Sequence, residues 1–138
     1  MGVVEMSPTQ QLRKSTLENN GRAEPVEIWK ARNFVREHSE EKLSLGRVAK
    51  SVNISSNYLS EKFKQVTGEN LVRYISRTRV EKARNLLHNG DLRISEIAFA
   101  VGFQSLSQFN RSFKKLTRKS PTRFRAARAK RVKRVKRR

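Results

Sequence analysis

The chain contains no cysteine, which excludes disulfide bonds and thiolate metal sites. Its two histidines, His38 and His88, are far apart in sequence and form no pair of metal ligands. No apolar run approaches the roughly 18 residues that span a membrane, and the N-terminus lacks the apolar core of a secretory signal. We therefore expect a cytoplasmic protein without a metal or any other cofactor.

Acidic residues are scarce as well. The 138 residues include 12 Asp and Glu against 32 Lys and Arg, which gives a net charge of +20. Such a charge favours polyanionic partners, with nucleic acid first and an anionic membrane surface second. Clustered carboxylates, a histidine pair and a phosphate-binding glycine loop are all missing, so we expect no enzymatic activity.

The most informative stretch, residues 94–124, reads ISEIAFAVGFQSLSQFNRSFKKLTRKSPTRF. Apolar residues recur at helical spacing up to Val101, and Gly102 then interrupts the pattern as expected of a tight turn. Ser105 is a good N-cap for a second, amphipathic helix. The stretch therefore predicts a helix-turn-helix over about residues 94–116. The polar face of its second helix can bond base edges or phosphates and carries Ser107, Asn110, Arg111 and Lys114.

The same pattern occurs earlier in the chain. Residues 45–74 read LGRVAKSVNISSNYLSEKFKQVTGENLVRY, and they match the later stretch at an offset of 49 before the turn and 50 after it. The slip of one residue falls at the turn, where a loop tolerates it. We therefore predict two helix-turn-helix units in tandem, the first over about residues 45–66.

The remaining segments complete an all-α fold of about seven helices. Residues 1–24 have no periodic pattern and are interpreted as a disordered arm or linker. Pro25 suits the start of a helix that continues to His38. A long helix over about residues 70–88 joins the two units. Its polar face, either a solvated surface or a polyanion-binding one, carries Arg73, Arg77, Arg79, Lys82 and Arg84.

The C-terminal end is almost entirely basic. Pro121 begins a last helix, which we expect to be short and to end at Phe124. Residues 125–138 read RAARAKRVKRVKRR and include nine Lys or Arg. A segment of this composition is typically disordered until it meets a polyanion.

Over about residues 25–125 the pattern resembles the DNA-binding domain of the AraC/XylS family of bacterial transcription regulators. The joining segment YISRTRVEKARNLL fits family positions at Tyr74, Arg79, Ala83 and Leu87. The most specific match is ISEIAFAVGFQSLSQFNRSFKKLTRKSP, with Ile97-Ala98, Gly102-Phe103, Phe109, Arg111, Phe113-Lys114 and Ser120-Pro121. The resemblance implies a sequence-specific regulator that inserts two recognition helices into successive major grooves of double-stranded DNA. It also implies a monomeric DNA-binding part, no cofactor, and RNA polymerase as a further partner.

The resemblance also assigns site residues. Base-reading positions fall at Asn57, Ser60 and Glu61 in the first unit, and the offset of 50 pairs them with Ser107, Asn110 and Arg111 in the second. Secondary candidates for DNA contact are Ser56, Leu106 and Gln108. We expect basic residues on and after the recognition helices to bind phosphates: Lys62, Lys64, Lys114, Lys115, Arg118 and Lys119.

Three departures from the family pattern stand out. Arg118 replaces the usual glycine, which predicts a looser turn with more attraction for phosphate. Glu61 is unusual among base-reading residues; it either accepts from a cytosine amino group or pairs with a neighbouring basic residue, and we favour the pairing. Only 24 residues precede the unit, where most family members have a sensor or dimerisation domain. The chain is thus either a stand-alone regulator or the DNA-binding end of a longer one.

Two other classes of protein fit the charge. The first is a non-specific RNA-binding or ribosome-associated protein, although the chain lacks the aromatic and glycine signatures of single-strand RNA modules. The second is a membrane-surface protein anchored by the basic tail. A preference for particular duplex sequences separates the DNA-binding hypothesis from both.

Overall fold

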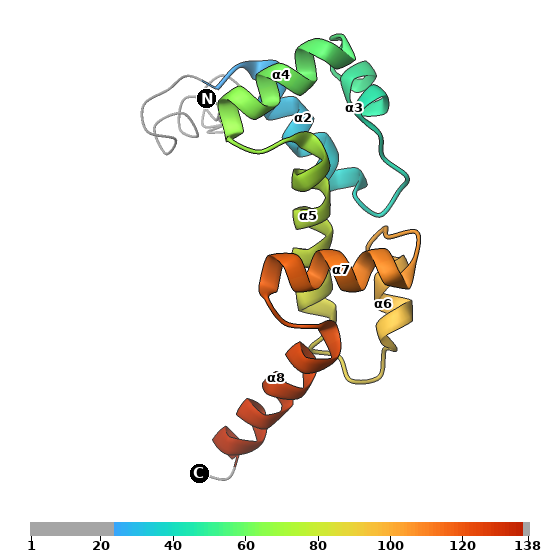
Figure 1. Ribbon diagram of the computed structural model, residues 1–138, viewed down its shortest axis with the longest axis vertical. Coiled ribbons are helices and arrows are strands. Elements are labelled where there is room, and N and C mark those ends of the chain that lie inside the picture. The colour runs from blue at the N-terminus through green and yellow to red at the C-terminus, as the bar shows by residue number, and fades with distance from the viewer. Residues whose placement is uncertain (1–23, 137–138) are drawn as a thin grey trace, which may run out of the picture. The chain divides into compact units, whose positions relative to one another are not determined.

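The computed structural model describes the backbone of residues 24–136 and the side chains of residues 24–129. The regular secondary structure of this part of the chain is all helical, which confirms the predicted all-α class. None of its helices has the length and apolar character needed to cross a membrane. The expected N-terminal arm lies outside the described residues apart from Glu24. The helices, shown in Figure 1, are α2 (Val26–His38), α3 (Leu45–Ser51), α4 (Ser56–Thr67), α5 (Leu71–Leu86), α6 (Ile94–Ala100), α7 (Leu106–Thr117) and α8 (Pro121–Lys136).

The described residues divide into two compact units. Residues 24–37 and 44–71 form the first unit, and residues 38–43 and 72–136 form the second. The first unit therefore contains α3, α4 and all of α2 except its last residue, His38, whereas the second contains nearly all of α5 together with α6, α7 and α8. The short segment between α2 and α3 belongs to the second unit, although both of the helices that it joins belong to the first.

The first unit buries one face of each of its helices. Ile28 and Val35 of α2, Val48 of α3, and Leu59 and Phe63 of α4 are fully shielded from solvent. Burial of each such side chain contributes roughly 1.5–3 kcal/mol, which is how three short helices become stable together.

Glu24, the last residue of the expected arm, is also buried, and its carboxylate pairs with Arg32 on α2 at 2.7 Å. The arm interpretation is therefore wrong at this residue. The ion pair explains the difference, because a carboxylate in a buried position needs a charged partner.

The second unit has a core rich in phenylalanine. Phe103, Phe109 and Phe113 are buried, with ring centroids 5.3 Å apart for the first pair and 5.6 Å for the second. Phe124 of α8 meets Phe113 edge-on at 5.4 Å. Tilted and edge-on arrangements of this kind add about 0.5–1.5 kcal/mol per pair beyond the burial itself. The aromatic row thus fixes α7 and the start of α8 on one core.

Arg79 departs from the sequence-based expectation. It was placed on the polar face of the joining helix, but its side chain is buried and hydrogen-bonded. Its Nε donates to the Ser39 carbonyl at 2.8 Å, and its Nη2 donates to the Glu41 carbonyl at 3.0 Å. The guanidinium also lies over the Phe103 ring, 5.8 Å from its centroid. Burial lowers the pKa of Arg79, but a guanidinium stays charged in proteins, so these carbonyls must compensate the charge.

Gly102 occupies the turn that the sequence predicted, and the reason for a glycine there is twofold. Its φ of +109° lies in the region that side-chain-bearing residues avoid. A Cβ at this position would lie 2.2 Å from the Ser39 carbonyl oxygen and 2.7 Å from Arg79 Nε. The turn before α7 can therefore approach segment 38–43 only because residue 102 has no side chain.

We expect Gly102→Ala to destabilise the second unit by about 2–4 kcal/mol, because backbone strain and overpacking each cost about 1–3 kcal/mol. Chemical denaturation followed by circular dichroism would measure the change. Gly90→Ala is the matched control, since a Cβ there meets no atom within 4 Å. Equal denaturation midpoints for the two variants would contradict the analysis.

The C-terminal helix is longer than the sequence suggested. A short helix ending at Phe124 and a disordered tail from residue 125 were predicted, but α8 continues to Lys136, so both predictions are wrong over this range. Residues 137–138 lie outside the described part. The helix starts well, because Ser120 Oγ accepts from the Arg123 amide at 3.2 Å and Pro121 tolerates the first turn.

Candidate nucleic-acid interface

The two helix-turn-helix motifs, α3–α4 and α6–α7, begin their second helices in the same way. Ser55 Oγ accepts from the Tyr58 amide at 3.1 Å, and Ser105 Oγ accepts from the Gln108 amide at 3.1 Å. Each serine thereby satisfies one of the amides that a helix start leaves without a partner. The same serine cap therefore begins α4 and α7, as the repeat in sequence predicted.

The turns themselves share a hydrogen bond and differ by one residue. The Ile54 amide donates to the Ala49 carbonyl at 3.1 Å, and the Phe103 amide donates to the Ala98 carbonyl at 3.0 Å. These bonds preserve the offset of 49, whereas the caps that follow are offset by 50. The additional residue is therefore Gln104, which lies between the turn and the start of α7.

The two recognition helices also end alike, despite different residues. Gly68 follows α4 with a φ of +83°, and Arg118 follows α7 with a φ of +68°. Their amides donate to the carbonyls of Lys64 and Lys114 at 2.9 and 2.7 Å. The looser turn that we expected at Arg118 is therefore wrong: the same geometry is kept, at a strain of about 1 kcal/mol for a residue with a Cβ.

We expect Arg118→Gly to stabilise the second unit by about 1 kcal/mol, because glycine adopts a positive φ without this strain. Arg118→Ala is the control, since it removes the same charge but keeps the Cβ. Thermal unfolding in high salt would compare the two variants with the parent chain. Equal stabilisation by both substitutions would assign the gain to charge removal and not to the backbone.

The predicted base-reading residues of the first unit lie on one exposed face of α4. Asn57, Ser60 and Glu61 are exposed, while Leu59 and Phe63 on the opposite side are fully buried. Helical spacing explains the arrangement, because residues three and four apart share a face. The structure thus brings these three side chains to one solvent-facing stripe.

The second unit repeats the arrangement on α7. Ser107, Asn110 and Arg111 are exposed, and Phe109 and Phe113 are buried. In both units the buried aromatic or aliphatic pair therefore determines which residues face outward. Base contact by either stripe remains a prediction.

Glu61 has no ion-pair partner among the described residues, so the pairing that we favoured is not found in this part of the chain. Its carboxylate is exposed on the α4 stripe. The other interpretation, acceptance from a cytosine amino group, is therefore the one that we retain.

The secondary candidates differ in availability. Leu106 is 39% exposed and Ser56 is half-buried. Gln108 is exposed, but its Oε1 already accepts from the Gln104 amide at 3.3 Å. The carbonyl half of this side chain is thus occupied within the protein.

Tyr58 is a surface residue that the sequence reasoning missed. It is 43% exposed on α4, and its hydroxyl donates to Glu27 Oε1 at 2.9 Å. This hydrogen bond is the main cause that raises the pKa of Tyr58. The available signal was the offset of 50, which pairs Tyr58 with Gln108.

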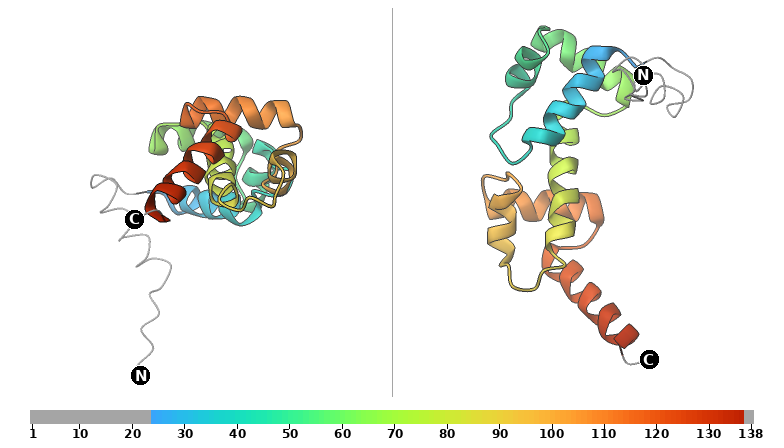
Figure 2. Two further views of the ribbon diagram at one scale, coloured as in Figure 1. Left: turned by 90° about the horizontal axis from the view of Figure 1, so that it is seen from below. Right: turned by 180° about the vertical axis from the view of Figure 1, so that it is seen from behind.

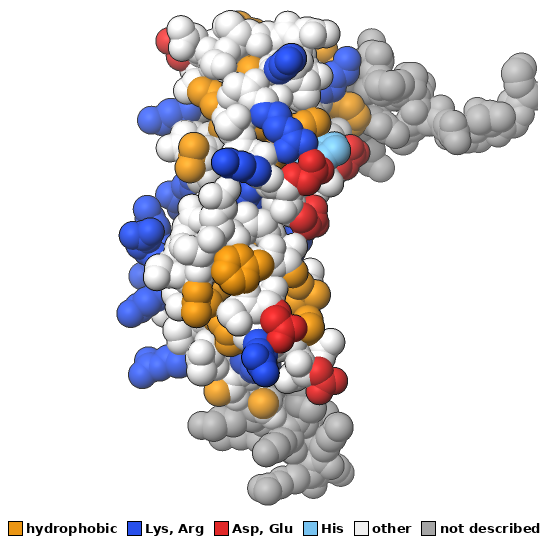
Figure 3. Space-filling view, turned by 90° about the vertical axis from the view of Figure 1, so that its right-hand side faces the viewer, with side chains coloured by type: hydrophobic (Ala, Val, Ile, Leu, Met, Phe, Trp, Pro, Cys, Tyr) orange, Lys and Arg blue, Asp and Glu red, His pale blue; other side chains and the backbone are white. Residues whose placement is uncertain are grey.

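The predicted phosphate-binding residues are mostly accessible. Lys62 is half-buried, and the others, Lys64, Lys114, Lys115, Arg118 and Lys119, are exposed. Figure 3 shows Lys and Arg side chains distributed over the visible surface, with acidic side chains at only a few places. The surface is therefore suited to a polyanion.

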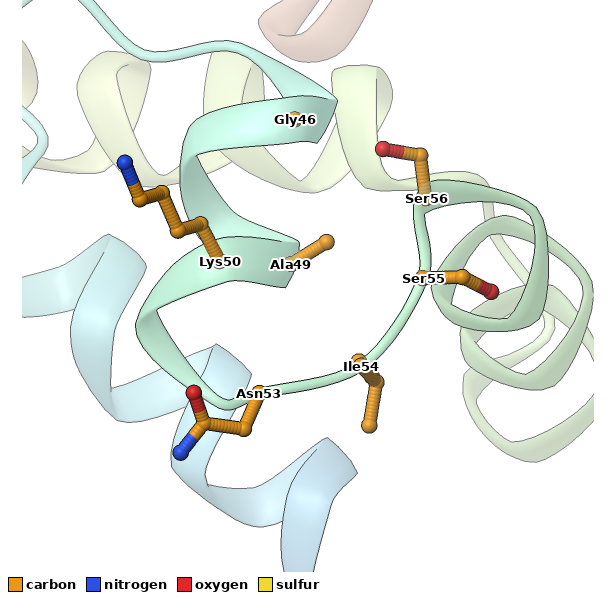
Figure 4. A pocket seen from close by; sticks show the side chains of 7 residues that line it. All are labelled: Gly46, Ala49, Lys50, Asn53, Ile54, Ser55 and Ser56. Carbon is orange, nitrogen blue, oxygen red and sulfur yellow. The ribbon is translucent and has the colours of Figure 1, made fainter.

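A hollow of about 530 Å³ lies beside the turn of the first unit. Figure 4 shows Ala49 and Ser56 on its two sides, while the side chain of Lys50 points away from Ser55 and Ser56. A Cβ at Gly46 would lie 3.8 Å from Ser56 Oγ, an ordinary van der Waals contact, so the hollow does not depend on this glycine. The hollow is thus a gap between α3 and the start of α4, and Lys50 carries the only charge among the residues that line it.

Known proteins share this arrangement. A family model described as a helix-turn-helix domain matches residues 48–127. The regulator YijO of Escherichia coli (strain K12), described as an uncharacterised HTH-type transcriptional regulator, is 36% identical over 94 residues, which is 68% of this chain and 33% of YijO. The chain spans between 16% and 40% of the length of the first three curated relatives that it matches.

Solved structures agree with the sequence comparison. A transcriptional regulator from Chromobacterium violaceum, described as having an AraC-type DNA-binding domain, is 30% identical, with a TM-score of 0.69 over 75% of this chain and 92% of that one. The DNA-binding domain of AdpA, a global transcriptional factor solved with a target DNA, is 26% identical, with a TM-score of 0.71 over 76% and 96%. The chain therefore belongs to the AraC/XylS family of helix-turn-helix proteins.

Proposed function

We propose that this chain is a sequence-specific double-stranded DNA-binding transcription regulator that places α4 and α7 in successive major grooves of one site. The observation that carries the proposal is the pair of equally capped helices, each with a stripe of three exposed polar residues. An α-helix fits the major groove, where every base pair presents a distinct pattern of donors and acceptors. The complex of the similar AdpA domain with a target DNA supports the assignment.

The two stripes suit different bases. Arg111 can bond guanine O6 and N7 together, and Asn57 and Asn110 can each bond adenine through N6 and N7. Glu61 accepts only, so it selects the cytosine amino group and is repelled elsewhere by the phosphate backbone. Because positions 61 and 111 correspond in the repeat but carry opposite charges, the two halves of the site should differ in sequence.

A monomeric binding state and one protein partner follow from this function. One chain supplies both recognition helices, so the DNA-binding part acts as a monomer on an asymmetric site. A regulator bound to DNA must also influence transcription, and we include contact with RNA polymerase in the proposal. Val72 and Phe99, which are 69% and 56% exposed and lie outside the reading stripes, are available for such a protein contact.

We expect Arg111→Ala to weaken the preferred site by about 1–3 kcal/mol more than random duplex, because it removes a bidentate contact to guanine. Lys115→Ala is the control; it lies on the same helix and should weaken both duplexes equally. Fluorescence anisotropy at fixed salt would measure the four affinities. An equal loss on both duplexes for Arg111→Ala would reassign this residue to phosphate binding.

We also expect selection from a random duplex library to return an asymmetric site. Footprinting should then show two protected major-groove segments about one helical turn, or roughly 34 Å, apart, bound by a single chain. A palindromic site that requires two chains would contradict the tandem arrangement. Failure to enrich any sequence would favour the non-specific nucleic-acid-binding alternative.

A further inference from the structure

The third residue of each recognition helix uses part of its hydrogen-bonding capacity within the protein. These residues are Tyr58 in α4 and Gln108 in α7, which correspond at the offset of 50. Both side chains are exposed. Each precedes a charged base-reading candidate by three residues, Glu61 in α4 and Arg111 in α7, and residues at this spacing are neighbours on a helix surface. The two side chains therefore lie beside the reading stripes.

Tyr58 can offer DNA only an acceptor. Its hydroxyl donates its one hydrogen to Glu27 Oε1 at 2.9 Å, and Figure 2 shows α2 beside α4 within the first unit. Glu27 lies in the first turn of α2, where the helix dipole stabilises a carboxylate. The same hydrogen bond raises the pKa of Tyr58, so the phenol keeps its proton at neutral pH. The hydroxyl oxygen retains lone pairs but has no second hydrogen to donate to a phosphate.

Gln108 has the opposite polarity. Its Oε1 accepts from the Gln104 amide at 3.3 Å, and only the oxygen end of an amide side chain can accept from a backbone N–H. The amide nitrogen of Gln108 carries two hydrogens, for which no acceptor is found among the described residues. Gln104 is the additional residue of the second unit, so the first unit has no counterpart of this hydrogen bond. Gln108 therefore presents a donor to DNA.

Each recognition helix thus presents two groups of the same polarity, three residues apart. In α4 the Tyr58 hydroxyl and the Glu61 carboxylate both accept, whereas in α7 the Gln108 amide and the Arg111 guanidinium both donate. In the major groove, cytosine and adenine present amino donors, and guanine and thymine present carbonyl acceptors. Residues at this spacing have Cβ atoms about 5–6 Å apart, which corresponds to one or two base-pair steps of about 3.4 Å.

We propose that Tyr58 and Gln108 are further specificity-determining residues, of which Tyr58 selects an amino group of cytosine or adenine and Gln108 selects a carbonyl oxygen of guanine or thymine. This inference rests on the proposed function and extends it to base pairs next to those read by the charged candidates. Glu27 and Gln104 are positioning residues, because their hydrogen bonds determine which group of each side chain is left for a base.

The test begins with selection of a preferred duplex by the full chain. Glu61→Ala and Arg111→Ala then locate the base pairs that these two residues read, since the preference at those pairs disappears. Duplexes altered at one neighbouring base pair are compared as affinity ratios within each variant, because a change in protein charge affects all duplexes alike. Exchanging an amino-bearing base for a carbonyl-bearing one at the Tyr58 pair should weaken binding about 3- to 10-fold, as expected for one hydrogen bond.

Two variants test Tyr58. Tyr58→Phe removes the hydroxyl but keeps the ring, so the ratio at its base pair should fall to about one. Glu27→Ala frees the hydroxyl hydrogen, which can then bond a carbonyl as well, and the ratio should fall in the same direction. Glu37→Ala is the matched control, because it removes the same charge from an exposed position of α2 and should leave the ratio unchanged.

Gln108→Glu tests the second helix. It keeps an oxygen for the Gln104 amide but replaces the donor by another acceptor, so the preference at its base pair should reverse to cytosine or adenine. The affinity for all duplexes should also fall because of the added negative charge. Gln65→Glu adds the same charge at an exposed position of α4, and it should lower all affinities without reversing any preference.

The possible results are distinct. An unchanged ratio with Tyr58→Phe would overturn the assignment for α4. Absence of a reversal with Gln108→Glu would overturn the assignment for α7, and an equal loss on every duplex beyond that of Gln65→Glu would place Gln108 on a phosphate. Failure of the selection to enrich any duplex would refute the proposed function itself, whereas enrichment with unaffected ratios would refute only this inference.

Discussion

The hydrogen bonds from Arg79 to the carbonyls of Ser39 and Glu41 are the interaction on which the second unit depends. A buried guanidinium is tolerated only when its donors find acceptors, and here they come from the backbone that follows α2. The approach of that backbone excludes a side chain at residue 102. The turn then positions Phe103 against Phe109, whose burial decides which residues of α7 face outward. One charged side chain in the core thus determines the orientation of the reading stripe.

Comparison of the two units distinguishes the features that both helix-turn-helix motifs share from the exposed residues that differ between them. The serine caps, the turn hydrogen bond and the left-handed residue after the recognition helix are the same in both. The exposed stripes differ at each corresponding position, from Asn57 to Ser107, from Ser60 to Asn110 and from Glu61 to Arg111. Two DNA half-sites of different sequence would require this combination, in which the helix-turn-helix framework is the same and the exposed residues differ.

Much of this shared helix-turn-helix framework could be predicted from short sequence patterns. The caps, the turn glycine and the apolar spacing of each helix depend on residues a few positions apart, and a repeat within one chain allowed each unit to check the other. The burial of Arg79 was not predictable in this way, because a guanidinium on a polar helix face normally points to solvent and its acceptors lie about 40 residues earlier. The length of α8 was missed for the same reason. Arg125 of α8 donates hydrogen bonds to the carbonyls of Leu87 and Asn89, which lie 38 and 36 residues earlier. The stripes were correctly placed on exposed faces, whereas pairing of Glu61 depends on three-dimensional neighbours that sequence does not reveal.

Segment 38–43 belongs to the second unit although it precedes α3 in the sequence, and this limits how the second unit can be exchanged between related proteins. A crossover between residues 71 and 72 would transfer α6 and α7 with their own turn, but it would leave the carbonyls of Ser39 and Glu41 behind. Arg79 would then meet whatever backbone the other parent supplies, and a mismatch there leaves a buried charge uncompensated. Each unit therefore has its own recognition helix, but a single crossover between them does not transfer the second unit intact. Exchange of the second recognition helix between relatives is expected to succeed when segment 38–43 is transferred with it, or when only the exposed stripe is exchanged.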